Sequence, residues 1–348
     1  MLKGRLGGFF FQLIALILAL SFVSLILLSI GASPIEAYKN MLTGSLGSTR
    51  KFAEVLVSFV PLLLVTAGLL ITFSAGLWNI GVEGQVVLGA IASVWVFRIF
   101  IDSTLPPTFI IFLSFLGGML GGALWAALAG VLKTFGGVNE IFGGLGLNFV
   151  STALTLYLIF GPWKRAGVAS MSGTEPFPDS FSLAQIENLR ISPTALIIAL
   201  VGIVIVYFIL QGTYFGLKLK AVGKNFRAAY LLGIPTWQYS MYSFLICGAL
   251  AGIAGAVQVT AVYHRLIPSI SSGYGYLGLM VAMLINYQAI WAIPVALFFA
   301  ALNIGSIQLP IVLKLDSSLS GVLQGVLVLF ALLVEGARQK YFKKASHS

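Results

Sequence analysis

The chain has 348 residues, of which 59% are hydrophobic and only 9% are charged, and its formal net charge is +10 at pH 7. Ordinary soluble domains carry about 25% charged residues, so this composition excludes a soluble globular fold. The apolar runs are long and unbroken rather than short and alternating, which also excludes a transmembrane β-barrel. The sequence therefore predicts an all-α polytopic membrane protein in which residues 1–348 form a single transmembrane domain.

Apolar segments recur along the whole chain, and about ten of them approach the ~20 residues that a membrane-spanning helix requires. The predicted spans lie at about 9–31, 55–75, 84–101, 108–132, 143–161, 194–211, 239–262, 274–287, 289–306 and 318–334. Five spans in each half, about 9–161 and 194–334, would make the two halves inverted repeats. Glycines at the GxxxG spacing, at 117–122 and 248–255, predict close packing of the fourth and seventh spans.

Positive charge is concentrated in two polar segments beside the predicted membrane. One is the stretch 213–237, which we name the basic segment, and the other is the tail 335–348. Because lysine and arginine accumulate in cytoplasmic segments near the membrane, we expect both of these segments and the N-terminus to be cytoplasmic. An alanine-rich middle and a Gly-Ile-Pro end predict a short helix in the basic segment, followed by a fixed exit into the next span.

The loop 162–193, which we name the outer loop, is the longest segment on the predicted outer side. It contains Trp163, several prolines and charges of both signs. Two interpretations are open, because such a loop can be a solvated connector or a docking surface for an external partner.

A glycine-rich stretch at 76–90 follows one predicted span and opens another. It places Asn79, Glu83 and Gln85 among three glycines. An acid at the bilayer centre costs about 2.5–3.5 kcal/mol, so acids there face a cavity, a partner or the interface. Glu83 therefore lies either in an interfacial loop at the start of a helix or in a broken helix that lines a translocation path.

A second glycine-rich stretch, 271–278, opens the apolar helix that ends at Asn286 and contains Tyr274 and Tyr276. We expect the first stretch to lie toward the cytoplasm and the second toward the outside. Glycine-interrupted segments at corresponding positions of inverted halves indicate a substrate site. The tyrosines could stack on a planar solute.

Uncharged polar side chains also lie inside or beside predicted spans: Asn148, Gln258, Asn286, Asn303 and Gln308. A single amide in a membrane helix either forms an interhelical hydrogen bond or contacts a ligand. Together with the tyrosines, these amides favour a path for a neutral, hydrogen-bonding solute over a path for an inorganic ion.

The sequence lacks a phosphate-binding loop of the form G-x-x-x-x-G-K-[ST]. Gly223 and Lys224 are followed by Asn225, and Lys218 stands where the first glycine should be. It also has no G-x-S-x-G elbow and no H-E-x-x-H motif. With one cysteine and two histidines, it can form neither an intrachain disulfide nor a histidine-rich metal site. We therefore expect no enzymatic activity and no cofactor in this chain.

Four stretches resemble the permease subunits of bacterial and archaeal ABC importers, in the branch that includes branched-chain amino acid, ribose and nucleoside systems. The similarity is greatest to nucleoside and simple-sugar permeases. The stretches are N-I-G-V-E-G-Q-V-V-L-G-A at 79–90, G-V-N-E-I at 137–141 with L-N at 147–148, T-Y-F-G-L-K-L-K-A-V-G-K-N at 213–225 with G-I-P at 233–235, and G-Y-G-Y-L-G-L-M-V-A-M-L at 273–284. Lys220 replaces the arginine of typical members, which keeps the charge but loses the planar bidentate fork.

The resemblance implies a multi-subunit importer in the cell membrane. Two permease subunits, identical or homologous, form the pathway, two cytoplasmic ATPase subunits use ATP, and an external solute-binding protein or lipoprotein delivers the solute. It implies that the basic segment is the coupling helix that contacts the ATPase, through Lys218, Lys220, Gly223, Lys224, Asn225, Arg227, Ala228, Gly233 and Pro235. The expected path-lining residues are Asn79, Glu83, Gln85, Asn148, Tyr274, Tyr276 and Asn286.

The expected solute is a nucleoside, with a simple sugar or a branched-chain amino acid as alternatives. Two other classes of protein also fit the pattern. An ion-coupled secondary transporter would have the same broken helices and repeats. A scaffolding membrane protein would have a solid core without a path.

Overall fold

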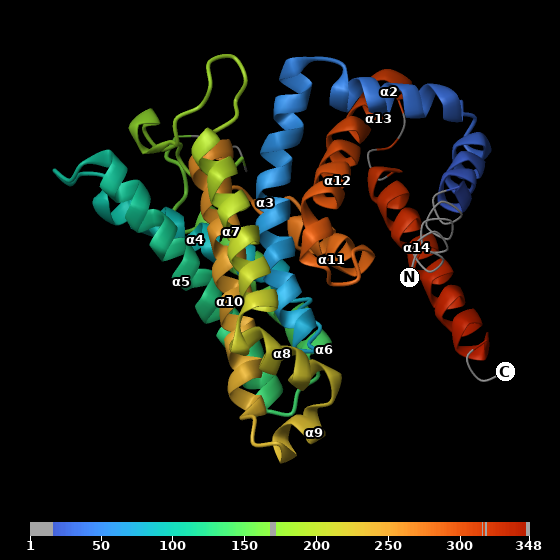
Figure 1. Ribbon diagram of the computed structural model, residues 1–348. Helices are drawn as coiled ribbons and strands as arrows, with labels where there is room; N and C mark the ends of the chain where they lie inside the picture. The colour runs from blue at the N-terminus through green and yellow to red at the C-terminus, as the bar shows by residue number, and fades with distance from the viewer. Residues whose placement is uncertain (1–16, 168–171, 315, 317–318, 346–348) are drawn as a thin grey trace. The chain divides into compact units, whose positions relative to one another are not determined.

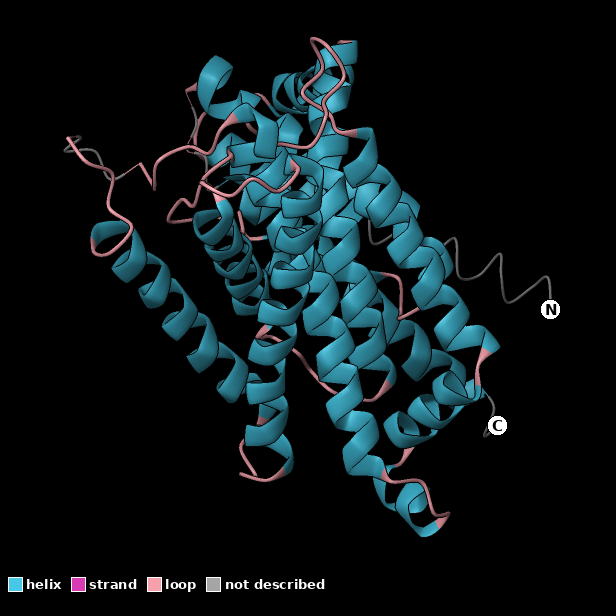
Figure 2. Cartoon of the chain, turned by 90° about the vertical axis from the view of Figure 1, so that its left-hand side faces the viewer, coloured by secondary structure: helices cyan, strands magenta, loops and turns pink. Residues whose placement is uncertain are grey.

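The computed structural model describes residues 17–167, 172–314, 316 and 319–345, and within these ranges every regular element is a helix (Figures 1 and 2). Seven of the described helices are long and apolar enough to cross a membrane. They are α3 (Thr49–Ser74), α4 (Val82–Phe100), α5 (Pro107–Thr134), α6 (Glu140–Phe160), α7 (Pro193–Gly212), α10 continued by η2 (Thr236–Tyr263), and Ala289–Leu313. The all-α membrane fold is therefore confirmed.

The first and eighth predicted spans differ from a simple crossing helix. Residues 9–16 of the first lie outside the described residues, and the described part is a helix over Ile17–Ser29 that α2 (Pro34–Leu46) follows at an angle of 113°. The eighth is α11 (Tyr274–Leu284), which has 11 residues. A helix of that length rises about 16 Å, roughly half of the ~30 Å hydrocarbon core, so α11 cannot cross the membrane alone.

The chain divides into two compact units, residues 1–55 with 298–348, and residues 56–297. The first unit contains α2, α13 (Gln308–Leu313) and α14 (Leu319–Ala345), whose apolar side chains share one cluster. The second unit contains the two glycine-rich stretches and the basic segment. Since these units do not follow the predicted halves, the arrangement of two inverted repeats and the single-domain organisation stay predictions.

Helices α4, α5 and α10 pack tightly against one another in the second unit because glycines on their facing surfaces let the backbones approach. A Cβ atom added at Gly252 of α10 would collide with the carbonyl oxygen of Gly118 and lie 3.1 Å from the Cα of Gly122, both in α5. Gly252 also meets Gly89 of α4. The close packing predicted from the glycine spacing is confirmed.

Replacing Gly252 with leucine should therefore destabilise the protein by about 1–3 kcal/mol or more, because the new side chain must push α5 and α4 away from α10. Gly146 of α6 is the matched control, since a Cβ there would have no atom within 4 Å. We expect Gly252→Leu to lower the temperature at which the detergent-solubilised protein loses its monodisperse peak in size-exclusion chromatography. Gly146→Leu should leave that temperature unchanged, and equal temperatures for the two variants would contradict the packing argument.

Candidate functional site

The interruption predicted between the second and third spans is present. Helix α3 ends at Ser74 and α4 begins at Val82, and we name residues 75–81 between them the α3–α4 break. Gly76 adopts a φ of +73° there, a left-handed conformation that glycine accepts without steric cost at the end of a helix. The chain thus leaves α3 in a sharp turn before it enters α4.

Asn79 and Gln85 form a reciprocal amide pair across the start of α4. The Nδ2 of Asn79 donates to the Oε1 of Gln85 at 3.1 Å, and the Nε2 of Gln85 donates to the Oδ1 of Asn79 at 2.9 Å. The two residues are only 1% and 0% exposed. Asn79 also contacts the Sγ of Cys247 in α10 at 3.1 Å. The pair therefore satisfies its own polar groups inside the protein and fixes the α3–α4 break onto α10.

Asn148 of α6 bonds to the end of the α3–α4 break and to the start of α4. Its Oδ1 accepts the Gly84 N–H at 2.8 Å, and its Nδ2 donates to the Ile80 carbonyl oxygen at 3.0 Å. Of the two interpretations of an amide within a span, the interhelical hydrogen bond is thus present. Asn148 supplies an acceptor for a donor that would otherwise be free at the helix start.

Glu83 joins the two glycine-rich stretches. Its carboxylate accepts the Ser271 hydroxyl at 2.5 Å and the Gly275 N–H at 2.7 Å. Gly275 lies in the first turn of α11, where the positive end of the helix favours a negative charge. Among the described residues, no lysine or arginine forms an ion pair with Glu83. The hydrogen bonds and the positive end of α11 therefore stabilise the carboxylate, as a lysine or arginine would in an ion pair.

The two glycine-rich stretches meet, the first of them expected toward the cytoplasm and the second toward the outside. Direct hydrogen bonds between Glu83 and the start of α11 require them to meet. Because α11 is too short to cross the membrane alone, its start can lie within the bilayer, and the expected sides of the two stretches stay a prediction. The structure thus brings two helix starts, those of α4 and α11, to one place.

The predicted tyrosines lie in different surroundings. Tyr274 is buried and its hydroxyl donates to the Ser58 Oγ at 3.0 Å. Tyr276 is 42% exposed, and its hydroxyl lies 3.4 Å from the Nδ2 of Asn148. Asn286 is exposed in the turn after α11, with a φ of 52°. Tyr276 and Asn286 thus have access to the surface and Glu83 is half-buried, whereas Tyr274 is enclosed.

An aromatic cluster that the sequence analysis missed lies where the α3–α4 break and the turn after α11 approach each other. The Phe73 ring centroid lies 5.4 Å from that of Trp78 and 5.0 Å from that of Tyr287. Trp78 is 38% exposed and Tyr287 is 37% exposed. Half-exposed aromatic rings beside interrupted helices provide flat apolar faces on which a ring-shaped solute could stack. The sequence offers one signal for this cluster, because Trp78 and Tyr287 stand next to the predicted path residues Asn79 and Asn286.

The basic segment forms two short helices, α8 (Tyr214–Lys224) and α9 (Phe226–Leu231), rather than one (Figure 1). Asn225 separates them, because its Oδ1 accepts the Ala228 N–H at 2.9 Å and thereby caps α9. Gly233, two residues after the end of α9, has a φ of +79°. The predicted helical middle and glycine stop are thus present, with an unpredicted division at Asn225.

The charges of the basic segment are not equivalent. Lys218, Lys224 and Arg227 are exposed, together with the apolar side chains of Tyr230 and Leu231. Lys220 is half-buried, and its Nζ donates to the Oε1 of Gln211 at 3.2 Å within the same chain. The segment therefore offers a mixed surface, with exposed basic side chains on α8 and at the start of α9 and apolar ones at the end of α9, and Lys220 contributes less to it than its neighbours.

The described part of the outer loop is packed against the end of α10 and η2 (Gln258–Tyr263). The Leu183 N–H donates to the Thr260 carbonyl oxygen at 3.0 Å, and the Gln185 Nε2 donates to that of Ala261 at 2.8 Å. These carbonyls belong to η2, a π-helix, in which hydrogen bonds span one residue more than in an α-helix. Phe177 and Phe181 of the loop pack on Phe97. The loop is therefore not a freely solvated connector in this region.

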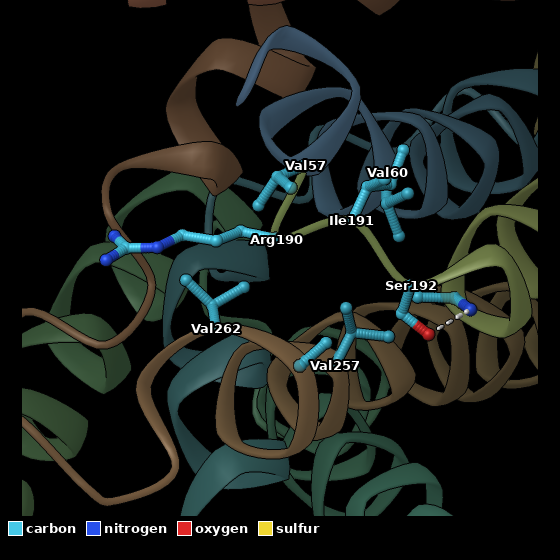
Figure 3. A pocket seen from close by; sticks show the side chains of 9 residues that line it. Val57, Val60, Arg190, Ile191, Ser192, Val257 and Val262 are labelled. Carbon is cyan, nitrogen blue, oxygen red and sulfur yellow. Dashed lines mark hydrogen bonds between the residues drawn. The ribbon is translucent and has the colours of Figure 1, made fainter. Parts of the chain in front are cut away.

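A crevice under the outer loop has a volume of only 10 Å³. Its walls come from α3, the loop at 190–192, α7, α10 and η2, and mainly aliphatic side chains line it, among them Val57, Val60 and Val257 (Figure 3). That volume holds about one water molecule. Nearby, burial lowers the pKa of His264 below its usual value, and the charge of Asp179 partly offsets this effect. The crevice is too small for a solute.

Among the described residues, no three His, Cys, Asp or Glu side chains could hold a metal ion together. The fold and the site instead define a polytopic membrane protein whose helices are interrupted at one shared polar position. The sequence matches the family of branched-chain amino acid transport system permease components over residues 52–332. The chain belongs to this family.

Relatives with named functions match along most of their length. The chain is 30% identical to the guanosine ABC transporter permease protein of Bacillus subtilis, over 94% of this chain and 93% of the relative. It is 29% identical to the glucose ABC transporter permease protein of Haloferax volcanii, over 91% and 85%. It is 28% identical to a nucleoside ABC transporter permease protein of Lactococcus lactis, over 84% and 82%. The family is a permease component and is not itself the ATPase.

Proposed function

We propose that the chain forms the translocation path of an ATP-driven importer for nucleosides. The observation that carries this proposal is its similarity to guanosine and nucleoside permeases along nearly the whole chain. The chemistry of the site agrees with it, because amides, hydroxyls and half-exposed aromatic rings can meet both the ribose and the base of a nucleoside. An ion-coupled secondary transporter is not supported by membership of a permease-component family.

In this proposal, the residues around the two interruptions have two different tasks. Asn79, Gln85, Asn148 and Tyr274 hold the α3–α4 break and α11 in position. Glu83, Tyr276 and Asn286 face the path, and Trp78 and Tyr287 add flat apolar faces to it. This division follows from burial, because side chains that are fully enclosed and paired can orient the lining but cannot contact a passing solute.

The remaining parts of the assembly follow the permease scheme. Ten membrane helices or half-helices would form two inverted halves, and two permease subunits, identical or homologous, would form the pathway in the cell membrane. The N- and C-termini and the basic segment would lie in the cytoplasm, where the basic segment contacts an ATPase subunit. An external binding protein or lipoprotein would deliver the solute.

A simple sugar is the second candidate solute, because the glucose permease of Haloferax volcanii matches this chain over a similar length. The two candidates differ in what the aromatic cluster should do. A base would stack on Trp78 and Tyr287, whereas a sugar would depend more on hydrogen bonds to Asn286 and Tyr276. A branched-chain amino acid is the third candidate, because the relatives compared above are named for guanosine, nucleosides or glucose.

Reconstitution into proteoliposomes with the ATPase subunits and the external binding protein tests the proposal. The vesicle lumen takes the place of the cytoplasm, and we expect uptake of radiolabelled guanosine only when the lumen contains ATP. The binding protein loaded with guanosine should also stimulate ATP hydrolysis. Glucose uptake under the same conditions would select the sugar alternative. Uptake that needs an ion gradient and no ATPase subunit would overturn the importer proposal.

A further inference from the structure

Helix α8 of the basic segment is attached to the rest of the second unit along one buried face, formed by Gly216, Leu219 and Val222. Gly216 lies against the end of α7, where an added Cβ would collide with the Ile209 carbonyl oxygen and lie 2.8 Å from the Cα of Leu210. Helix α9, by contrast, exposes Tyr230 and Leu231. Since α9 contacts both α8 and α10, a partner that binds α9 would act on the membrane helices through α8 as well as through α10.

The last turn of α8 touches the α3–α4 break directly. A Cβ added at Gly223 would collide with the Ser74 carbonyl oxygen and lie 2.9 Å from the backbone nitrogen of Gly76. Conversely, a Cβ added at Gly76 would lie 3.0 Å from the Gly223 carbonyl oxygen and 3.1 Å from its Cα. Two backbones in contact have no side chain between them whose rotation could absorb a shift. A displacement of α8 at this point must therefore move the break as well.

The break continues into the polar site. Three residues after Gly76, Asn79 begins the amide pair with Gln85 in the first turn of α4. In the same turn, Glu83 holds the start of α11. An unbroken series of close contacts thus runs from the basic segment through Gly223 and Gly76 to the two helix starts.

We propose that Gly223 is a positioning residue that transmits movement of the basic segment to the α3–α4 break through its backbone contact with Gly76, and thereby sets how much solute is transported for each ATP hydrolysed. This inference rests on the proposed importer function. It differs from docking of the ATPase, because Gly223 acts after the partner has bound to the exposed charges and apolar side chains.

The local backbone makes Gly223 a suitable position for a test. It lies within α8 and its φ is not in the left-handed region, so the helix itself would accept alanine, which is about 1 kcal/mol better than glycine in a helix interior. Only the contact with the break opposes the added methyl group. Gly76 is unsuitable, because its φ of +73° would add backbone strain to any steric effect.

The experiment compares Gly223→Ala with a control variant in the assembled transporter, reconstituted with its ATPase and binding protein. Gly212→Ala at the end of α7 adds a methyl group whose nearest neighbour is the Phe208 Cδ1 at 3.9 Å. We expect Gly223→Ala to keep ATP hydrolysis and to lower guanosine uptake per ATP by about fivefold, the size of an altered coupling of roughly 1 kcal/mol. Gly212→Ala should match the wild type.

A wild-type ratio of guanosine uptake to ATP hydrolysis for Gly223→Ala, or an equal loss for Gly212→Ala, would overturn the inference while leaving the importer function intact. Failure of the wild-type complex to couple ATP to uptake would instead overturn the importer function. If Gly223→Ala does not assemble, amide hydrogen exchange of the wild-type complex decides. We expect nucleotide binding to change protection in residues 75–81 together with 214–224, and a change confined to 214–232 would overturn the inference.

Discussion

Replacing Glu83 with alanine should abolish most transport, with uptake at least about tenfold below the wild type, while the protein still inserts and assembles. The Gly275 N–H and the Ser271 hydroxyl would lose their shared acceptor, and leaving a buried donor unsatisfied costs about 1–3 kcal/mol. The start of α11 would also lose the negative charge at its positive end. Because α11 is too short to span the membrane, such contacts at its start determine where it lies.

A graded series of variants identifies which property of Glu83 matters. Glu83→Gln keeps the size and one acceptor oxygen but not the charge, so we expect an intermediate loss of uptake. Ser271→Ala removes one donor to the carboxylate and should lower guanosine uptake less than Glu83→Ala or Glu83→Gln does. Glu187→Gln in the outer loop is the control, because that side chain is exposed. Guanosine uptake by proteoliposomes, together with size-exclusion profiles, gives the comparison. Uptake of Glu83→Ala within about twofold of the wild type would refute a role at the junction.

The sequence predicted the interruptions well because their signals are local. Glycines in an apolar context mark the end of α3 and the start of α11, and the alternation of long apolar runs predicts the full spans. The packing of α5 on α4 and α10 could also be predicted from the sequence, since GxxxG spacing places small residues on one helix face. The division of the basic segment at Asn225 could have been found as well, because asparagine is a favoured N-cap residue.

Long-range partners could not be predicted in this way. Glu83 bonds to residues 188 and 192 positions away, and nothing in the local pattern of either stretch indicates the other. Asn79 and Gln85 show a second limit, because the same polar residue types serve as a path lining or as an internal pair, and only burial distinguishes the two. The cluster of Trp78 and Tyr287 with Phe73 could not be predicted either, because nothing in the local pattern shows that the α3–α4 break and the turn after α11 approach each other.

Reversing the two exposed charges beside Asn225 should separate the permease from its ATPase. Lys224→Glu combined with Arg227→Glu places negative charge at the start of α9, where a cytoplasmic partner would meet the surface that also contains Tyr230 and Leu231. Like charges across an interface cost several kcal/mol, so we expect the affinity for the ATPase to fall by about tenfold or more and uptake to fall with it. Pull-down of the ATPase from detergent solution at several salt concentrations measures the effect.

Two further variants make this prediction specific to the site. Lys164→Glu combined with Arg165→Glu reverses two charges in the outer loop, on the opposite side of the proposed membrane, and should leave ATPase binding unchanged. Lys220→Glu alone should weaken binding less than the double variant, because the Lys220 ammonium is already directed to Gln211 of its own chain. Raised salt should reduce the difference between wild type and the Lys224→Glu, Arg227→Glu variant, since exposed charges are screened within about 10 Å at 0.1 M ionic strength. Equal binding by all variants would mean that the basic charge orients the chain in the membrane and does not recognise the partner.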